Sequence, residues 1–191
     1  MGTSTPASAP IAWLSAHEAQ RDVLDGLARF ATWEALWTEC PRGDWLLGIA
    51  ERIGVEHTHL VKAAALCARV ADPNEKAIHL LDRVDAWLAG TATAEDIARD
   101  THALDTALST APDPASEASM RAAVAVGMGV ADRRVLPSAP AAAVESIMMA
   151  SIDCGFELAM RWAHDKTATA VRQALPWSVA EPCIVKLEER G

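Results

Sequence analysis

The sequence contains no tyrosine and only two phenylalanines, so its aromatic packing depends on seven tryptophans. Runs of β-branched and aromatic residues, which are typical of strands, are scarce. Alanine, the strongest helix former, supplies much of the 51% hydrophobic fraction. The composition therefore predicts an all-α fold, and 191 residues are enough for one domain with a proper core.

The sequence also lacks membrane and export signals. No apolar run approaches the roughly 20 residues that a helix needs to cross a bilayer. Residues 1–10 carry neither the basic region nor the apolar region of a secretion signal, and Pro6 stands where myristoylation of Gly2 requires Ser or Thr. We therefore expect a cytoplasmic protein that does not associate with membranes.

Basic residues are in deficit: 17 Lys and Arg stand against 26 Asp and Glu, a formal net charge of −9. Nucleic-acid binding needs a basic face, so this charge argues against it. The acidity suits either ordinary solubility or a basic protein partner. The four cysteines form no C-x-x-C pair, so we expect buried thiols rather than disulfides or a zinc site. They are Cys40, Cys67, Cys154 and Cys183.

Residues 33–71 hold the best-marked helix boundaries. Pro41 disfavours helical dihedrals at Cys40 and so ends a first helix. Asp44 is placed to cap a second helix, and Gly54 to end it. The predicted second and third helices span 45–53 and 58–71.

Apolar periodicity and turn residues predict the other helices. Thr93 with Asp96 resembles a capping box, and Ser116 and Ser138 are candidate caps. Pro176 ends the last helix. The predicted ranges are 11–40, either continuous or interrupted near Gly26, then 75–89, 94–109, 117–131 and 139–164, with an extension to 175 left open.

The C-terminal segment 177–191 is predicted as a docked or frayed tail, with a strand-like run at 183–185. Residues 1–10 are predicted as a flexible tail. The sequence thus predicts a single all-α domain over 11–176. Its seven or eight helices would form a compact bundle or a short helical-repeat-like array.

Tryptophans are the main candidates for either core packing or binding. Trp33 and Trp37 are four residues apart and share one helix face. We interpret them, with Trp45, as core; the alternative is an aromatic binding patch. Trp13 and Trp177, near prolines and the chain ends, are expected to be more exposed.

Histidines could in principle bind a metal. Glu56 and His59 have the Glu-x-x-His spacing of di-iron bundles, but such sites need that pair twice and it occurs once. Surface or hydrogen-bonded histidines are the alternative, and we predict no metal, cofactor or catalytic residue. The histidines considered are His57, His59, His79, His102 and His164.

Other catalytic patterns are missing. The sequence has no G-x-S-x-G elbow and no glycine-rich phosphate loop. The tripeptide 42–44, Arg-Gly-Asp, is interpreted as a turn followed by a helix cap. Six carboxylates on two consecutive helices suggest an acidic face, either simply solvated or able to bind a basic protein. They are Asp82, Asp85, Glu95, Asp96, Asp100 and Asp105.

The run from Trp33 to Arg69, with its C-x-R-G-D-W-L-L core, resembles a group of small all-helical bacterial proteins that act as immunity proteins of polymorphic-toxin systems. Segments 77–93 and 171–176 fit the same pattern, whereas 110–166 lacks the tyrosines usual there. The resemblance implies binding and neutralisation of a cognate toxin, with no catalytic residues. It rests on Trp33, Cys40, Arg42, Gly43, Asp44, Trp45, Leu46, Leu47, Leu60, Val61, Ala64, Cys67, Ala68 and Arg69.

The leading hypothesis is therefore a non-enzymatic protein-binding module, in the form of an immunity protein whose acidic surface blocks a basic toxin domain. One alternative is a helical regulatory adaptor or scaffold. Another is a metal-dependent helical enzyme that uses His57, His59, His79 or His102.

Overall fold

The computed structural model describes residues 9–17, 19 and 21–189. Over these residues the chain forms eleven α-helices, three short 3-10 helices and no strand. The predicted all-α class is confirmed, but seven or eight helices is too few. Two segments predicted as long helices are divided, and the segment predicted as a C-terminal tail contains a further helix. Most of the predicted tail 1–10 lies outside the described residues, and Pro10 already belongs to the first helix.

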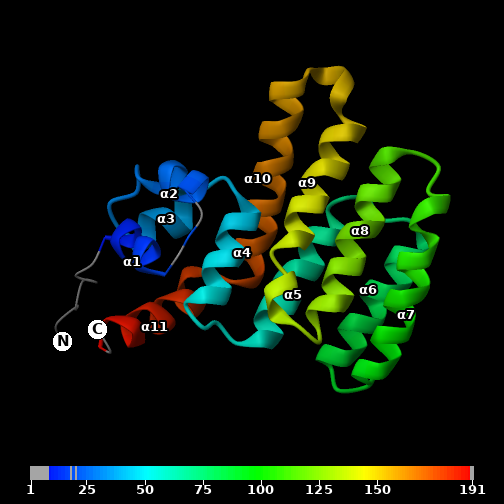
Figure 1. Ribbon diagram of the computed structural model, residues 1–191, viewed down its shortest axis with the longest axis horizontal. Helices are drawn as coiled ribbons and strands as arrows, with labels where there is room; N and C mark the ends of the chain where they lie inside the picture. The colour runs from blue at the N-terminus through cyan, green and yellow to red at the C-terminus, as the bar shows by residue number, and fades with distance from the viewer. Residues whose placement is uncertain (1–8, 18, 20, 190–191) are drawn as a thin grey trace.

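Figure 1 shows three neighbouring groups of helices. On one side stand α6 (Glu75–Leu88), α7 (Ala94–Ala107) and α8 (Pro114–Gly129), which pack against one another. At the other end lie α1 (Pro10–Ala16), α2 (Arg21–Leu27), α3 (Trp33–Glu39) and α11 (Trp177–Glu188). Between them run α4 (Gly43–Arg52), α5 (His57–Arg69), α9 (Ser138–Ala150) and α10 (Phe156–Ala174). None of the helices in the described part of the chain has the length and apolarity needed to span a bilayer.

The segment predicted as a helix over 11–40 is three short helices. The break after α2 follows Gly26, against which the ring of Trp45 packs so closely that an added Cβ would lie 2.2 Å from it. Thr32 then starts α3, because its hydroxyl accepts from the backbone N–H of Ala35. Cys40 has extended dihedrals before Pro41, as predicted.

The Arg-Gly-Asp tripeptide is a packing junction at the start of α4. Asp44 does not cap the helix as predicted; it accepts two hydrogen bonds from the Arg42 guanidinium, at 2.9 and 2.5 Å. Gly43 allows α4 to meet α10, since an added Cβ would lie 2.7 Å from the carbonyl carbon of Thr167. Gly54, with φ of +82°, ends the helix region as expected.

Side-chain caps set the starts of α6, α7 and α8. The predicted capping box of Thr93 and Asp96 is present at the start of α7, and Asn74 caps α6. The predicted cap at Ser116 is wrong: Asp113 caps α8, which begins at Pro114. Proline suits that first position because its missing N–H is not needed there. Buried alanines fill the contacts of α8 with its neighbours.

The predicted long helix from 139 is a hairpin. Ser138 is not a cap, since its hydroxyl donates to the carbonyl of Val135. The chain leaves α9 through a 3-10 turn, η3 (Ile152–Cys154), and reverses at Gly155, whose φ is +96°. Only glycine adopts such a conformation at little cost. α10 then returns along α9, and the far end of the hairpin rises beyond the other helices (Figure 1).

The predicted C-terminal strand is also wrong, because residues 183–185 lie within α11, which packs against α3. Two contacts fasten this end to the core. The indole N–H of Trp37 donates to the carbonyl of Leu175 at 2.8 Å, and Arg172 donates to the carbonyls of Trp37 and Cys40. Trp33 and Trp37 are buried core residues as predicted.

Four further tryptophans, Trp13, Trp45, Trp87 and Trp177, are half-buried. Trp45 is not fully enclosed in the core; it lies under the Arg42 guanidinium, 4.5 Å from the ring centre. Trp13 and Trp177, expected to be more exposed, both pack partly against the core.

Candidate interaction surfaces

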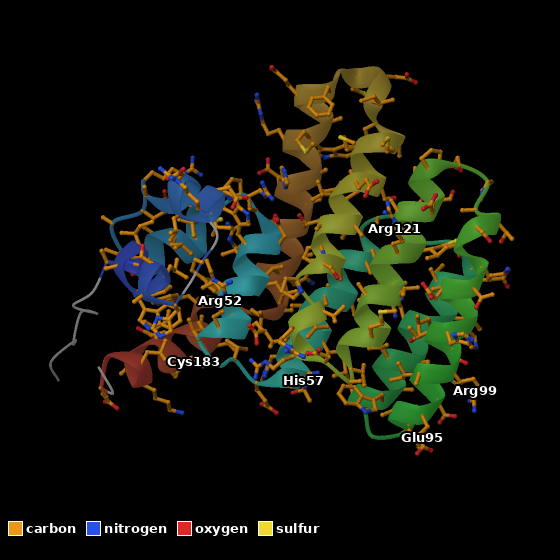
Figure 2. The ribbon with its side chains drawn as sticks, in the orientation of Figure 1. Arg52, His57, Glu95, Arg99, Arg121 and Cys183 are labelled. Carbon is orange, nitrogen blue, oxygen red and sulfur yellow. The ribbon has the colours of Figure 1, made fainter. Side chains whose placement is uncertain are left out.

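The histidines do not converge. His57 contacts the carbonyl of Gly129 at 2.8 Å, and His59 lies 3.4 Å from Glu56 in the same first turn of α5. His79 lies on α6, His102 on α7 and His164 on α10. Within the described residues no three side chains of the metal-binding types form a cluster. Figure 2 shows His57 at the start of α5, well away from Glu95 and Arg99 on α7.

The six predicted acidic residues do not form one uninterrupted patch. Asp82 and Asp85 both accept from Arg69 of α5, at 2.9 and 2.6 Å, so they lie at the seam between α5 and α6. These two carboxylates remain more than half exposed, and a single arginine neutralises only one of them.

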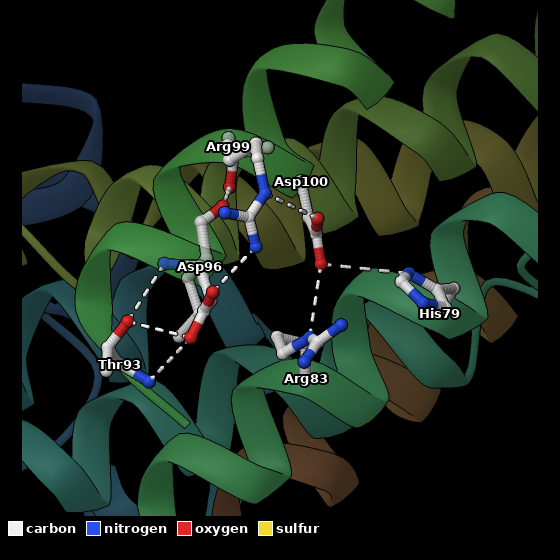
Figure 3. A network of polar contacts seen from close by, with 8 residues as sticks. His79, Arg83, Thr93, Asp96, Arg99 and Asp100 are labelled. Atoms are coloured by element: carbon white, nitrogen blue, oxygen red, sulfur yellow. Dashed lines mark hydrogen bonds and ion pairs between the residues drawn. The ribbon is translucent and has the colours of Figure 1, made fainter.

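Asp96 and Asp100 belong to a second cluster, between α6 and α7 (Figure 3). Arg83 donates to Asp100 at 3.2 Å, and His79 lies 3.8 Å from the same carboxylate. Arg99 donates to Asp96 at 2.6 Å. Hydrogen bonds from Thr93, reinforced by Arg99, lower the pKa of Asp96 to about 2. This carboxylate therefore stays ionised in a fixed position.

The remaining predicted acidic residues, Glu95 and Asp105, are exposed on α7 and form no ion pair within the described residues. Together α6 and α7 carry seven carboxylates and three basic side chains, a net charge of −4. These 28 residues thus hold close to half of the chain's net charge of −9. We call the outer surfaces of α6 and α7 the α6–α7 surface. It includes the four aspartates that form ion pairs, which are Asp82, Asp85, Asp96 and Asp100.

A cleft of about 590 Å³ lies between α2, α4 and α9. Its charged lining carries both signs, with three arginines and three carboxylates. Arg42 is held by Asp44, and Arg134 donates to Asp132 outside the lining. The cleft therefore shows no preference for a ligand of one charge.

A second surface is apolar and lies at the far end of the α9–α10 hairpin. The described residues include seven large apolar side chains that are well exposed, and five of them lie between the end of α9 and the second turn of α10, with 39–58% of their surface accessible. We call these five residues the hairpin tip. They are Met149, Ile152, Phe156, Leu158 and Trp162.

Sequence reasoning missed this surface because 139–164 was assigned to one continuous core helix. A signal was nevertheless present. Apolar residues occur at every second position from Phe156 to Trp162, and on a helix this spacing places them around the whole circumference. One helix neighbour, α9, cannot cover all of them.

Two of the four cysteines are buried as predicted, and Cys183 is half-buried. Cys40 and Cys67 are buried free thiols, and burial raises the pKa of both. Cys154 is exposed in the η3 turn, so the expectation of burial is wrong there, since the predicted helix is interrupted at this point.

No protein-family model matches this sequence, and comparisons with curated proteins and with solved structures give no significant match. The assignment of function therefore depends on the surfaces described above.

Proposed function

We propose that this chain is a binding protein that holds a basic protein partner on the α6–α7 surface. One observation carries the proposal: seven carboxylates stand against three basic side chains on two adjacent helices. Such an excess of one charge attracts a partner of opposite charge over a distance set by ionic strength, and it disfavours acidic competitors.

The fixed geometry of this surface supports the proposal. Arg99 and Thr93 hold Asp96, and Arg83 holds Asp100, so these carboxylates lose little side-chain freedom when a partner binds. Among the described residues no arginine pairs with Glu95 or Asp105, so both are available to the partner's lysines or arginines. Asp82 and Asp85 extend the surface toward α5.

The specific form that we propose is an immunity protein, located in the cytoplasm, that blocks a basic toxin domain without catalysing a reaction. This part rests on the resemblance of the Trp33 to Arg69 segment to immunity proteins of polymorphic-toxin systems. In such a role the acidic side chains would cover the basic surface with which a toxin meets its target.

The test uses the genes that flank the one encoding this chain. Each neighbouring product is expressed with and without the full-length chain, while growth and co-purification are measured. We expect one neighbour to be a basic protein that arrests growth alone, is harmless with this chain, and co-purifies with it. The double substitution Glu95→Lys/Asp105→Lys should abolish both effects.

A matched control has the same charge change elsewhere. Glu39→Lys/Glu181→Lys alters two exposed carboxylates of α3 and α11, and it brings the net charge of −9 to the same −5. This control should retain binding and protection. If both double variants behave alike, the α6–α7 surface is not the contact; if no neighbour is toxic, the immunity role is wrong.

A further inference from the structure

Gly48 leaves a notch in the wall of the cleft between α2, α4 and α9. A Cβ added there would meet no atom of another segment closer than Pro137, at 3.9 Å, so contacts between segments do not require glycine at this position. Glycine inside a helix is nevertheless less stable than alanine. What this glycine provides is space in the cleft, which holds about 590 Å³ in all.

The residues around the notch form one face of α4. On a helix surface, the neighbours of a residue are those three and four positions before and after it. For Gly48 all four of these neighbours line the cleft, and they carry an aromatic ring and charges of both signs. They are Asp44, Trp45, Glu51 and Arg52. The α4 wall of the cleft is therefore centred on the missing side chain.

Two charged side chains of the cleft have no ion-pair partner among the described residues. They are Asp22 of α2 and Arg52 of α4, and both are exposed. The other charged side chains of the lining do form ion pairs, which are Arg42 with Asp44, Glu51 with Arg133, and Arg134 with Asp132. One acidic and one basic group thus remain available to a ligand.

These two groups lie toward opposite ends of the cleft. Arg52 is in the last turn of α4 (Figure 2). Asp22 lies toward the other end of that helix, near Arg42, which immediately precedes α4. The hydrogen bond with Asp44 and, to a smaller extent, the charge of Asp22 raise the pKa of Arg42. Between Asp44 and Arg52, α4 rises by about 12 Å. The cleft therefore has a negative end and a positive end.

We propose that this cleft binds a short apolar peptide with free ends, whose amino group lies toward Asp22 and whose carboxylate lies toward Arg52. An extended chain covers about 3.3–3.6 Å per residue, so a tripeptide separates its two charges by about 10 Å. The cleft also offers apolar surface, with Val23, Ile49 and Ala141 from three helices. Its volume is in the range of sites that hold small molecules. A single amino acid, whose charged groups share one carbon atom, is too short to reach both ends.

Isothermal titration calorimetry of the full-length chain with the tripeptide Leu-Ala-Leu, up to about 5 mM, tests the proposal. We expect saturable binding of the peptide with both ends free. Acetylation of its amino end or amidation of its carboxyl end should each weaken binding about two- to fivefold, as for an ion pair at an open surface. The peptide blocked at both ends should bind more weakly than either, and free leucine should bind more weakly than the tripeptide.

Variants that remove one charge test the orientation of the peptide. Asp22→Asn should bind the acetylated and the free peptide equally, because it lacks the carboxylate that faces the amino group. Arg52→Gln should bind the amidated and the free peptide equally, for the corresponding reason. Each variant should still discriminate against the peptide that is blocked at the other end. Both positions are exposed, so we expect neither substitution to alter the fold.

A bulky side chain at the notch tests the place of binding. Gly48→Phe should fill the notch and abolish binding, with an unchanged far-ultraviolet circular dichroism spectrum. The matched control is Ala98→Phe, at an exposed position of α7 outside the cleft, and it should bind like the wild type. If Gly48→Phe does not fold, the comparison of Asp22→Asn with Arg52→Gln still decides the question.

Several results would overturn the proposal. One is a wild-type chain that does not bind the free tripeptide, and another is equal binding of the free and the doubly blocked peptide. The same holds if leucine binds as tightly as the tripeptide, if a folded Gly48→Phe variant binds like the wild type, or if Asp22→Asn still discriminates against acetylation.

This inference does not depend on the α6–α7 surface, which lies at the opposite end of the molecule from α2 (Figure 1). A chain that holds a basic protein but no peptide would leave the proposed function standing. A chain that binds the peptide but no basic protein would leave only the cleft site standing.

Discussion

Two glycines of α4, Gly43 and Gly48, test how this helix packs. Substitution by alanine should destabilise the protein at Gly43 and stabilise it at Gly48. At Gly43 an added Cβ would lie 2.7 Å from the carbonyl carbon and 2.9 Å from the carbonyl oxygen of Thr167. Both atoms belong to the backbone of α10 and cannot turn aside as a flexible side chain can. Gly43→Ala must therefore push α4 and α10 apart.

At Gly48 the nearest atoms are Cβ and Cγ of Pro137, both at 3.9 Å, which is ordinary van der Waals contact. Alanine is favoured over glycine inside a helix by roughly 0.5–1 kcal/mol, so Gly48→Ala should stabilise the protein by about that amount. Overpacking costs typically about 1–3 kcal/mol, which is the loss expected for Gly43→Ala.

The assay is thermal unfolding followed by circular dichroism, with urea unfolding as a second measure. For a chain of this size, 1 kcal/mol corresponds to roughly 2–4 °C in Tm. Gly43→Ala should lower Tm by about 2–12 °C, and Gly48→Ala should raise it by about 1–4 °C. If Gly43→Ala unfolds at or above the wild-type temperature, α4 and α10 do not meet at Gly43 and the Arg-Gly-Asp segment is not a packing junction.

Three further predictions concern buried groups. Trp37→Phe should destabilise the protein by about 1–3 kcal/mol in urea unfolding, because the buried carbonyl of Leu175 loses the indole N–H that donates to it. An unchanged unfolding midpoint would refute the hydrogen bond between Trp37 and Leu175. A maleimide reagent should modify Cys154 rapidly and leave Cys40 and Cys67 unmodified until urea unfolds the chain, as peptide mass mapping would show. Burial, and secondarily the charge of Arg42, lowers the pKa of His164, so the folded state binds fewer protons there than the unfolded state. Stability should therefore fall as the pH drops below about 6.5, and His164→Gln should reduce that slope between pH 7 and 5; an identical slope would contradict the assignment.

The helix boundaries that could be predicted are those set by neighbours in sequence. The capping box of Thr93 and Asp96 needs only residues three apart, and the end of α3 needs only Pro41. The hairpin reversal was missed because Gly155 has no adjacent proline and the apolar residues on both sides fit one long helix. Residues 183–185 have strand-like composition, but their place in α11 is set by packing against α3.

The candidate surfaces depend on contacts that are remote in sequence. The chain order placed six carboxylates on two consecutive helices, and both helices are present. The sequence could not show that Asp82 and Asp85 pair with Arg69 of α5, whereas Asp100 pairs with Arg83 of α6. Likewise, exposure of the hairpin tip depends on how far α9 and α10 extend beyond their neighbours, which no local pattern determines.

The most direct measurement for the central claim is affinity capture from the native host, in which bound proteins are identified and quantified by mass spectrometry. Wild type, Glu95→Lys/Asp105→Lys and the control Glu39→Lys/Glu181→Lys are compared at low and high salt. We predict that wild type and control retain the same basic protein, that the α6–α7 double variant loses it, and that high salt weakens the capture. Capture of no protein, or equal capture by all three chains, would contradict the account.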